Sequence, residues 1–146
     1  MLLRDVSYYQ TGGSCELWVA PKLVDELAEA MSRIHQDRTP YFLLGAGSNS
    51  LIMDGHWPGA VGMLNQLQGV SINKDRVLAE AGVENTRLAE QCLEVSLTGA
   101  EWMNCLPGQL GATVRMNARC YDGEIGRIVT SVKVVTPQGQ IGRAHV

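Results

Sequence analysis

The residues best suited to chemistry in this chain form a short loop of small side chains, Gly45-Ala46-Gly47-Ser48-Asn49-Ser50. Glycine lets a ligand approach the backbone closely because it has no Cβ. Successive backbone N–H groups that point inward form an anion-binding nest. Ser48 and Asn49 add side-chain donors. This combination is suited to cradling a pyrophosphate, so the loop is the first candidate binding site.

Two well-known glycine motifs are alternative explanations of this loop. A dinucleotide-binding G-x-G-x-x-G turn needs a third glycine and a long helix after it. Here Ser50 stands at the third position, and the helix breakers Gly55 and Pro58 follow soon afterwards. A P-loop needs Gly-Lys-Ser/Thr, which does not follow the glycines here. A plain strand-to-strand turn stays open as an alternative, because short glycine motifs carry little information.

A second stretch of small residues covers residues 106–118. Its side chains at Gly108, Gly111 and Ala112 would let the backbone pack against a flat ring system. Asn117 could donate and accept hydrogen bonds at the edge of such a ring. The alternative is close packing of one element on another, which also needs small residues. Two such loops could clasp a long ligand from both ends.

Hydrophobic periodicity predicts the elements that position these loops. Residues 14–20 alternate apolar and polar side chains, as in a half-buried strand. Residues 22–36 carry apolar side chains at helical spacing. Residues 41–44 form a short apolar run that predicts a buried strand. The first ~55 residues therefore predict a small β-α-β unit.

After this unit the pattern changes to short strands joined by turns. One helix is expected, with Asn85 or Thr86 as its cap. The predicted strands are residues 59–64, 70–72, 76–80 and 131–135, the last followed by a turn at 137–139 and a returning strand that barely starts at 140–141.

Composition excludes several classes of protein. Apolar residues make up 45% and charged residues 18% of 146 residues, which is typical of a globular protein. The net charge of −3 and the lack of a Lys/Arg cluster argue against a nucleic-acid binder. No apolar run reaches the ~18 residues that span a bilayer, and the N-terminus lacks the apolar segment of a secretory signal. We therefore expect a cytoplasmic protein without membrane contact.

Its four cysteines form no CxxC pair and its histidines are scattered, so we expect reduced thiols and no zinc site.

The order of the motifs resembles the MurB family, the UDP-N-acetylenolpyruvoylglucosamine reductases. That family carries GG near its start, then L-G-x-G-S-N-x-L, A-G-x-G, and G-x-E-x-x-x-x-I-P-G-x-x-G-G-A-x-x-M-N-A-G-A-Y-G-x-E-I. The resemblance extends from about Tyr9 to Ile141. The matching segments, in the same order, are Gly12-Gly13, Leu44-Gly45-Ala46-Gly47-Ser48-Asn49-Ser50-Leu51, Ala81-Gly82, Gly99-Ala100-Glu101, Leu106-Pro107-Gly108, Gly111-Ala112-Thr113, Met116-Asn117-Ala118 and Tyr121-Asp122-Gly123-Glu124-Ile125.

This resemblance implies an α+β, FAD-binding fold of the vanillyl-alcohol-oxidase and p-cresol-methylhydroxylase type. Residues 1–57 would form one small lobe and residues 58–146 a second, incomplete one. The resemblance implies FAD as cofactor, and a reductase that passes hydride from NADPH through the flavin to the enolpyruvyl ether of a UDP-sugar, for peptidoglycan synthesis. The implied FAD-binding residues are Gly45, Ala46, Gly47, Ser48, Asn49, Ser50, Leu51, Pro107, Gly108, Gly111, Ala112 and Asn117.

Three departures from the family pattern limit what can be carried over. Ala112 stands where the family has a second glycine, a change that we expect to be tolerated. Arg119 replaces another glycine. It would cost ~1 kcal/mol or more if that position needs a positive φ, or would add a cation near the phosphates, or would be a solvated surface residue. The family's catalytic serine, Tyr-Arg segment and late glutamate have no match here, so no catalytic residue is assigned.

These departures leave three functions open. The chain is expected to be the FAD-binding half of the reductase, inactive alone. The alternatives are a non-catalytic remnant or interaction module that keeps the fold, and another FAD oxidoreductase of the same fold. A half-enzyme would expose apolar surface that its other half covers, which favours self-association.

Overall fold

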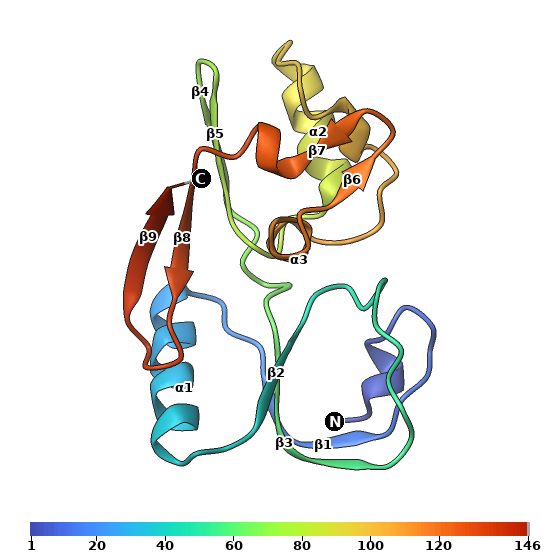
Figure 1. The fold of residues 1–146 in the computed structure, drawn as a ribbon, viewed down its shortest axis with the longest axis vertical. Helices are drawn as coiled ribbons and strands as arrows, with labels where there is room; N and C mark the ends of the chain where they lie inside the picture. The colour runs from blue at the N-terminus through green and yellow to red at the C-terminus, as the bar shows by residue number, and fades with distance from the viewer. Residues whose placement is uncertain (146) are drawn as a thin grey trace.

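The computed structural model describes residues 1–145, which form two halves stacked along the long axis of the molecule (Figure 1). Val146, the last residue of the predicted second lobe, lies outside the described residues. The first half is a parallel sheet in the order β1-β3-β2 with helix α1 against it. Its elements are β1 (Ser14–Val19), α1 (Val24–Gln36), β2 (Tyr41–Leu44) and β3 (His56–Met63), preceded by a 3-10 helix at Leu3–Asp5.

Helix α1 forms as its periodicity predicts. Leu27, Met31 and Ile34 recur at spacings of four and three residues, and all three are buried. At the N-terminus of α1 the Glu26 carboxylate accepts hydrogen bonds from the N–H groups of Lys22 and Leu23, at 2.8 and 3.4 Å. That acceptor satisfies donors for which the helix itself has no partners.

The sheet contains a third strand between the two strands of the predicted β-α-β unit. β1 and β2 do not pair with each other, because β3 lies between them and pairs with both in parallel. The predicted boundary at residue 57 therefore falls inside β3, and the first sheet continues to Met63. β2 was also expected to be buried, but as an edge strand it buries only Leu44. The other three residues of this strand, all large and apolar, are exposed, a feature that favours association; self-association stays a prediction.

The second half consists of short elements around a helix. The hairpin predicted in residues 70–80 is confirmed, with Lys74 at a φ of 55° in its turn. The returning strand that was expected to barely start is a full strand, paired along its whole length with its neighbour. The elements are β4 (Val70–Asn73), β5 (Arg76–Ala79), α2 (Asn85–Glu94), α3 (Leu110–Arg115), β6 (Arg119–Cys120), β7 (Gly123–Glu124), β8 (Ser131–Val135) and β9 (Ile141–His145), with 3-10 helices at Glu101–Met103 and Ile125–Arg127.

The β8–β9 hairpin ties the end of the chain back to the first half, where it lies beside α1 (Figure 1). Val135 packs on a buried cluster of Leu27, Met31 and Leu67. The turn approaches α1 so closely that a Cβ built on Gly139 would lie 2.3 Å from the Ala28 carbonyl oxygen. Only glycine fits this turn, where φ is +79°.

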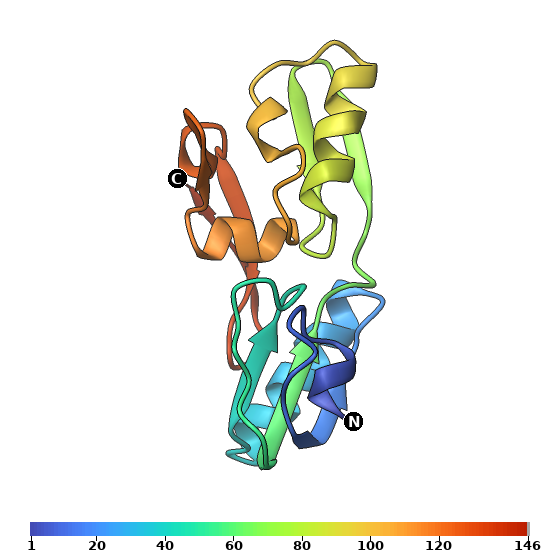
Figure 2. The same cartoon turned by 90° about the vertical axis from the view of Figure 1, so that its right-hand side faces the viewer.

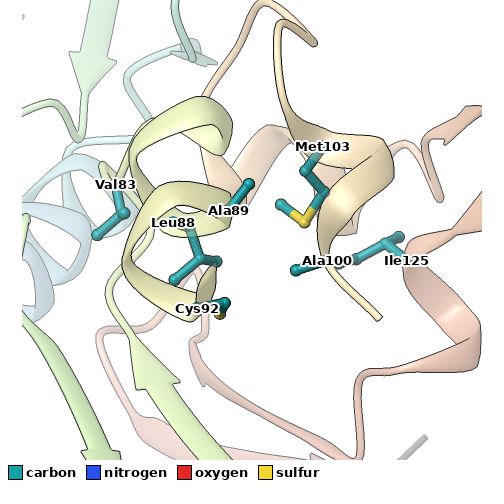
Figure 3. Close-up of a cluster of buried hydrophobic side chains, with 7 residues drawn as sticks. All are labelled: Val83, Leu88, Ala89, Cys92, Ala100, Met103 and Ile125. Atoms are coloured by element: carbon teal, nitrogen blue, oxygen red, sulfur yellow. The ribbon is translucent and has the colours of Figure 1, made fainter. Parts of the chain in front are cut away.

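Each half also has an apolar core of its own. In the first half Leu3, Cys15, Leu44 and Val61 pack together. In the second half α2 packs on the 3-10 helix at Glu101–Met103 (Figure 3). The buried residues of this second core are Val83, Leu88, Ala89, Cys92, Ala100, Met103 and Ile125. Within residues 1–145, no helix combines the length and the apolar character that crossing a bilayer demands.

We predict that Met103→Ala lowers the free energy of unfolding by about 2–5 kcal/mol, because Met103 is fully buried and its loss leaves a cavity. Urea denaturation followed by circular dichroism measures this change. Leu78→Ala is the control, because the Leu78 side chain is 71% exposed. Equal stability of the two variants would contradict the assignment of Met103 to the core.

A candidate cofactor site where two glycine loops meet

The first glycine loop leaves the sheet directly after β2, where buried Leu44 anchors it. No hydrogen bond within the described part of the chain engages the N–H groups of residues 46–49. The Ser50 N–H donates to the Gly47 carbonyl at 3.3 Å and closes the turn. Asn49 is exposed. The loop therefore holds four backbone N–H groups without a protein acceptor, that of the buried Gly47 among them, beside a polar side chain, and an anion-binding nest needs such donors.

Gly47 is required by its neighbours as well as by its conformation. Its φ is +70°, and a Cβ built there would lie 3.0 Å from Ser7 Cα and from the Tyr8 nitrogen. The N-terminal segment thus packs directly on the loop. Close packing explains this glycine without a ligand, so substitutions at Gly47 would disturb the fold.

The second glycine stretch lies against the first loop, although the two are far apart in sequence. The Ser48 hydroxyl donates to the Pro107 carbonyl at 3.3 Å. A Cβ built on Gly108, whose φ is +135°, would lie 3.6 Å from that same hydroxyl oxygen. Figure 2 shows the turn after β2 reaching α3. The tertiary structure thus brings both predicted loops together.

Small residues at the start of α3 make this approach possible. A Cβ built on Gly45 would lie only 2.9 Å from the Cβ of Ala112. The alanine that replaces the family's second glycine therefore faces a glycine, which leaves room for it. Gly111 packs on Ala81 instead: its N–H donates to the Ala81 carbonyl at 2.8 Å, and a Cβ built there would lie 2.8 Å from Ala81 Cβ. Element packing thus explains Gly111.

Asn117, predicted to bind the edge of a ring, is engaged by the protein at both ends of its amide. Its Nδ2 donates to Glu124 Oε1 at 2.6 Å, and its Oδ1 accepts the Gly126 N–H at 3.1 Å. Its backbone has a φ of 45°. In this structure the side chain joins the end of α3 to β7 and to the 3-10 helix that follows it.

Arg119 is neither strained nor an unpaired surface cation. It lies in β6, and the positive φ values nearby belong to Asn117 and Tyr121. Its Nη2 lies 2.9 Å from Glu124 Oε1, and Arg127 Nε lies 3.6 Å from Oε2. The Asn117 hydrogen bond, followed by the bond and charge of Arg119, holds the pKa of Glu124 below its usual value.

Asn85 supports the second loop, and sequence reasoning assigned it a different role. The cap position of α2 is Glu84, whose side chain makes no capping bond, so the predicted cap at Asn85 or Thr86 is wrong. Asn85 is fully buried: its Oδ1 accepts the Thr113 hydroxyl at 2.9 Å, and its Nδ2 donates to the Leu106 carbonyl at 3.4 Å. Its own N–H donates to the Gly108 carbonyl at 3.1 Å.

One feature of the sequence indicates that Asn85 is buried. It stands two residues after Val83, at the start of an otherwise apolar helix face. Buried polar side chains are almost always hydrogen-bonded, so such a residue predicts a partner. The partners themselves lie 21 and 28 residues away and could not be identified by spacing.

The site therefore combines unpaired backbone donors with a second loop fixed by buried hydrogen bonds. Such a nest suits the oxygens of a pyrophosphate. The fold and this site define a nucleotide-cofactor-binding domain. The profile of the family described as FAD binding domain matches residues 15–145, and the chain belongs to that family.

Within that family the chain matches the FAD-binding half of the UDP-N-acetylenolpyruvoylglucosamine reductases. It is 33% identical over 141 residues to the reductase of Clostridium novyi and 34% identical over 139 residues to that of Listeria monocytogenes. These matches cover 97% and 95% of this chain but 46% and 47% of the relatives. The chain thus spans about half the length of the curated relatives it matches.

Solved structures agree on the fold. The reductase (MurB) from Thermus caldophilus superposes with a TM-score of 0.79 at 28% identity, covering 99% of this chain and 51% of that one. A variant of berberine bridge enzyme superposes with a TM-score of 0.69 at 18% identity, covering 87% of this chain and 27% of that one. The second likeness concerns the fold alone. Together with the family match and the reductase structure, it confirms the predicted FAD-binding fold class.

We predict that Thr113→Val lowers the free energy of unfolding by about 1–3 kcal/mol, because it leaves the buried Asn85 Oδ1 without its donor. Thr98→Val makes the same chemical change at an exposed position and is the matched control. Urea denaturation compares both with the parent. If the two variants are equally stable, the Asn85–Thr113 bond does not contribute as described.

Proposed function

We propose that this protein holds FAD where its two glycine loops meet and acts as the FAD-binding half of an NADPH-dependent UDP-N-acetylenolpyruvoylglucosamine reductase. The observation that carries the proposal is the set of unpaired N–H groups at residues 46–49, placed against Pro107 and Gly108. Membership of the FAD binding domain family supports the identity of the cofactor.

Each loop would contribute different contacts to FAD. The backbone of Ala46, Gly47, Ser48 and Asn49 would bind the pyrophosphate oxygens, and the exposed Asn49 amide adds a further donor. The Pro107–Gly108 backbone forms the opposite wall, fixed by Asn85 from behind. FAD, when bound, supplies the hydride-transfer chemistry, and the protein binds and orients it.

The wider role follows from the relatives. The UDP-sugar as substrate is supported by the names of the matching reductases. NADPH as hydride donor, peptidoglycan synthesis and a cytoplasmic location are further parts of this proposal, which rest on the family resemblance of the sequence motifs. The 146 residues offer no match to the family's catalytic segments. We therefore propose that this half provides the cofactor site and that the reaction needs the other half as well.

We predict that the protein binds FAD in preference to FMN, because FMN lacks the pyrophosphate and adenylate. Asn49→Leu should weaken FAD binding by roughly 10- to 100-fold, since a charge-assisted hydrogen bond contributes about 1.5–3 kcal/mol. Quenching of flavin fluorescence during titration measures both affinities. Asn73→Leu, at the turn of the β4–β5 hairpin, is the matched control and should bind as the parent does.

The titration tests whether the first glycine loop binds FAD or is only a turn between two strands. An absence of saturable binding at high micromolar FAD would refute the proposed function. Equal affinity of the parent and Asn49→Leu would show that this side chain does not contact the cofactor.

We predict that the chain alone, loaded with FAD, does not reduce UDP-N-acetylenolpyruvoylglucosamine at an enzyme-like rate. Loss of one electrostatic donor from an active site costs about 10²–10³ in rate, and loss of substrate positioning adds to this. The measurement is anaerobic NADPH consumption with and without the UDP-sugar. Sugar-dependent turnover near ~1 s⁻¹ or above, within the usual enzyme range, would contradict the prediction.

A further inference from the structure

One carboxylate in the second half collects three partners. Glu124 Oε1 accepts from Asn117 Nδ2 at 2.6 Å and from Arg119 Nη2 at 2.9 Å, while Oε2 lies 3.6 Å from Arg127 Nε. The Glu124 side chain is only 16% exposed, whereas the two arginine side chains are 69% and 71% exposed. Glu124 is therefore the centre of this cluster, and the arginines approach it from the solvent side.

The cluster fixes the C-terminal end of α3. The Asn117 N–H donates to the Val114 carbonyl at 3.1 Å, and the Ala118 N–H donates to the Thr113 carbonyl at 2.9 Å. The Asn117 side chain then joins this end to Glu124 and to the Gly126 N–H. A helix of six residues has little stability of its own, so its position depends on such external bonds.

The middle of α3, at Ala112 and Thr113, lies against the candidate cofactor site. Ala112 faces Gly45 of the first loop, and Thr113 bonds to Asn85, which holds the second loop. A shift at the Asn117 end of so short a helix would therefore move the residues that contact both loops. The connection runs from Glu124 through Asn117 and α3 to the contact between the loops.

We propose that Glu124 is a positioning residue for the FAD site, acting through Asn117 and α3, and that Arg119 reinforces it. The proposal rests on the proposed function. Arg119 stands where the family resemblance has glycine, so this reinforcement is a feature of the present chain. A hydrogen bond from the amide to a carboxylate is charge-assisted and strong, whereas exposed ion pairs contribute little. Glu124 and Asn117 thus form the support, and Arg119 adds a smaller part.

Three variants separate these contributions. Glu124→Ala should raise the Kd for FAD roughly tenfold, as expected for one charge-assisted hydrogen bond, and should change the visible circular dichroism of bound flavin. Glu124→Gln should bring the Kd and the flavin spectrum back most of the way to those of the parent. Its amide oxygen still accepts the hydrogen bond from Asn117. Arg119→Ala should raise the Kd only about twofold, as an exposed pair predicts.

Arg33→Ala is the matched control, because it removes an exposed ion pair with Glu29 on α1, away from the site. It should leave both the Kd and the flavin spectrum as in the parent. Amide hydrogen exchange of Gly126, measured without FAD, reports directly on the Asn117 bond. It should speed up at least several-fold in Glu124→Ala and stay unchanged in Arg33→Ala.

The outcomes distinguish the two proposals. If the parent binds FAD, and Glu124→Ala binds it with equal Kd and an identical spectrum, the positioning role is overturned while the proposed function stands. If Gly126 exchanges at the parent rate in Glu124→Ala, Glu124 does not hold Asn117, and the role is overturned with or without FAD. If the parent does not bind FAD, the proposed function fails and the positioning role fails with it.

Discussion

The close approach of Gly45 and Ala112 is the constraint on which the rest of this molecule depends. A Cβ on Gly45 would lie 2.9 Å from that of Ala112, so any larger side chain there would push α3 away from the first loop. The Ser48–Pro107 hydrogen bond forms at the same junction. Because interiors are close-packed, one extra methyl group at this contact would be felt across both loops. The geometry of the candidate site follows from this contact.

The site that results is built from backbone groups and carries little charge. Its donors are the peptide N–H groups of the first loop, and the second loop beside them is held by the buried Asn85. Donors that are positioned in advance need little reorganisation when they bind an anion. The charged cluster at Glu124 lies one helix away, where it fixes α3. Binding and support are thus assigned to different residues.

Several elements could be predicted because near neighbours decide them. The predicted strand at residues 41–44 has the bounds of β2, and the predicted strands at 70–72 and 76–80 form the β4–β5 hairpin. The place of β3 in the first sheet was missed, because hydrophobic pattern does not reveal which strands pair. The prediction of Asn85 as a helix cap is wrong for a similar reason, since its hydrogen-bond partners are distant in sequence.

The sequence by itself determined the two glycine loops, the buried stripe of α1 and the family, because these depend on local composition and on the order of motifs. The tertiary structure decided which donors stay unpaired, and showed that Asn117 and Arg119 bond to Glu124. It also decided that β3 separates β1 from β2. The physical reason is the same in each case. A hydrogen bond or a close contact needs both partners, and here the second partner comes from another part of the fold.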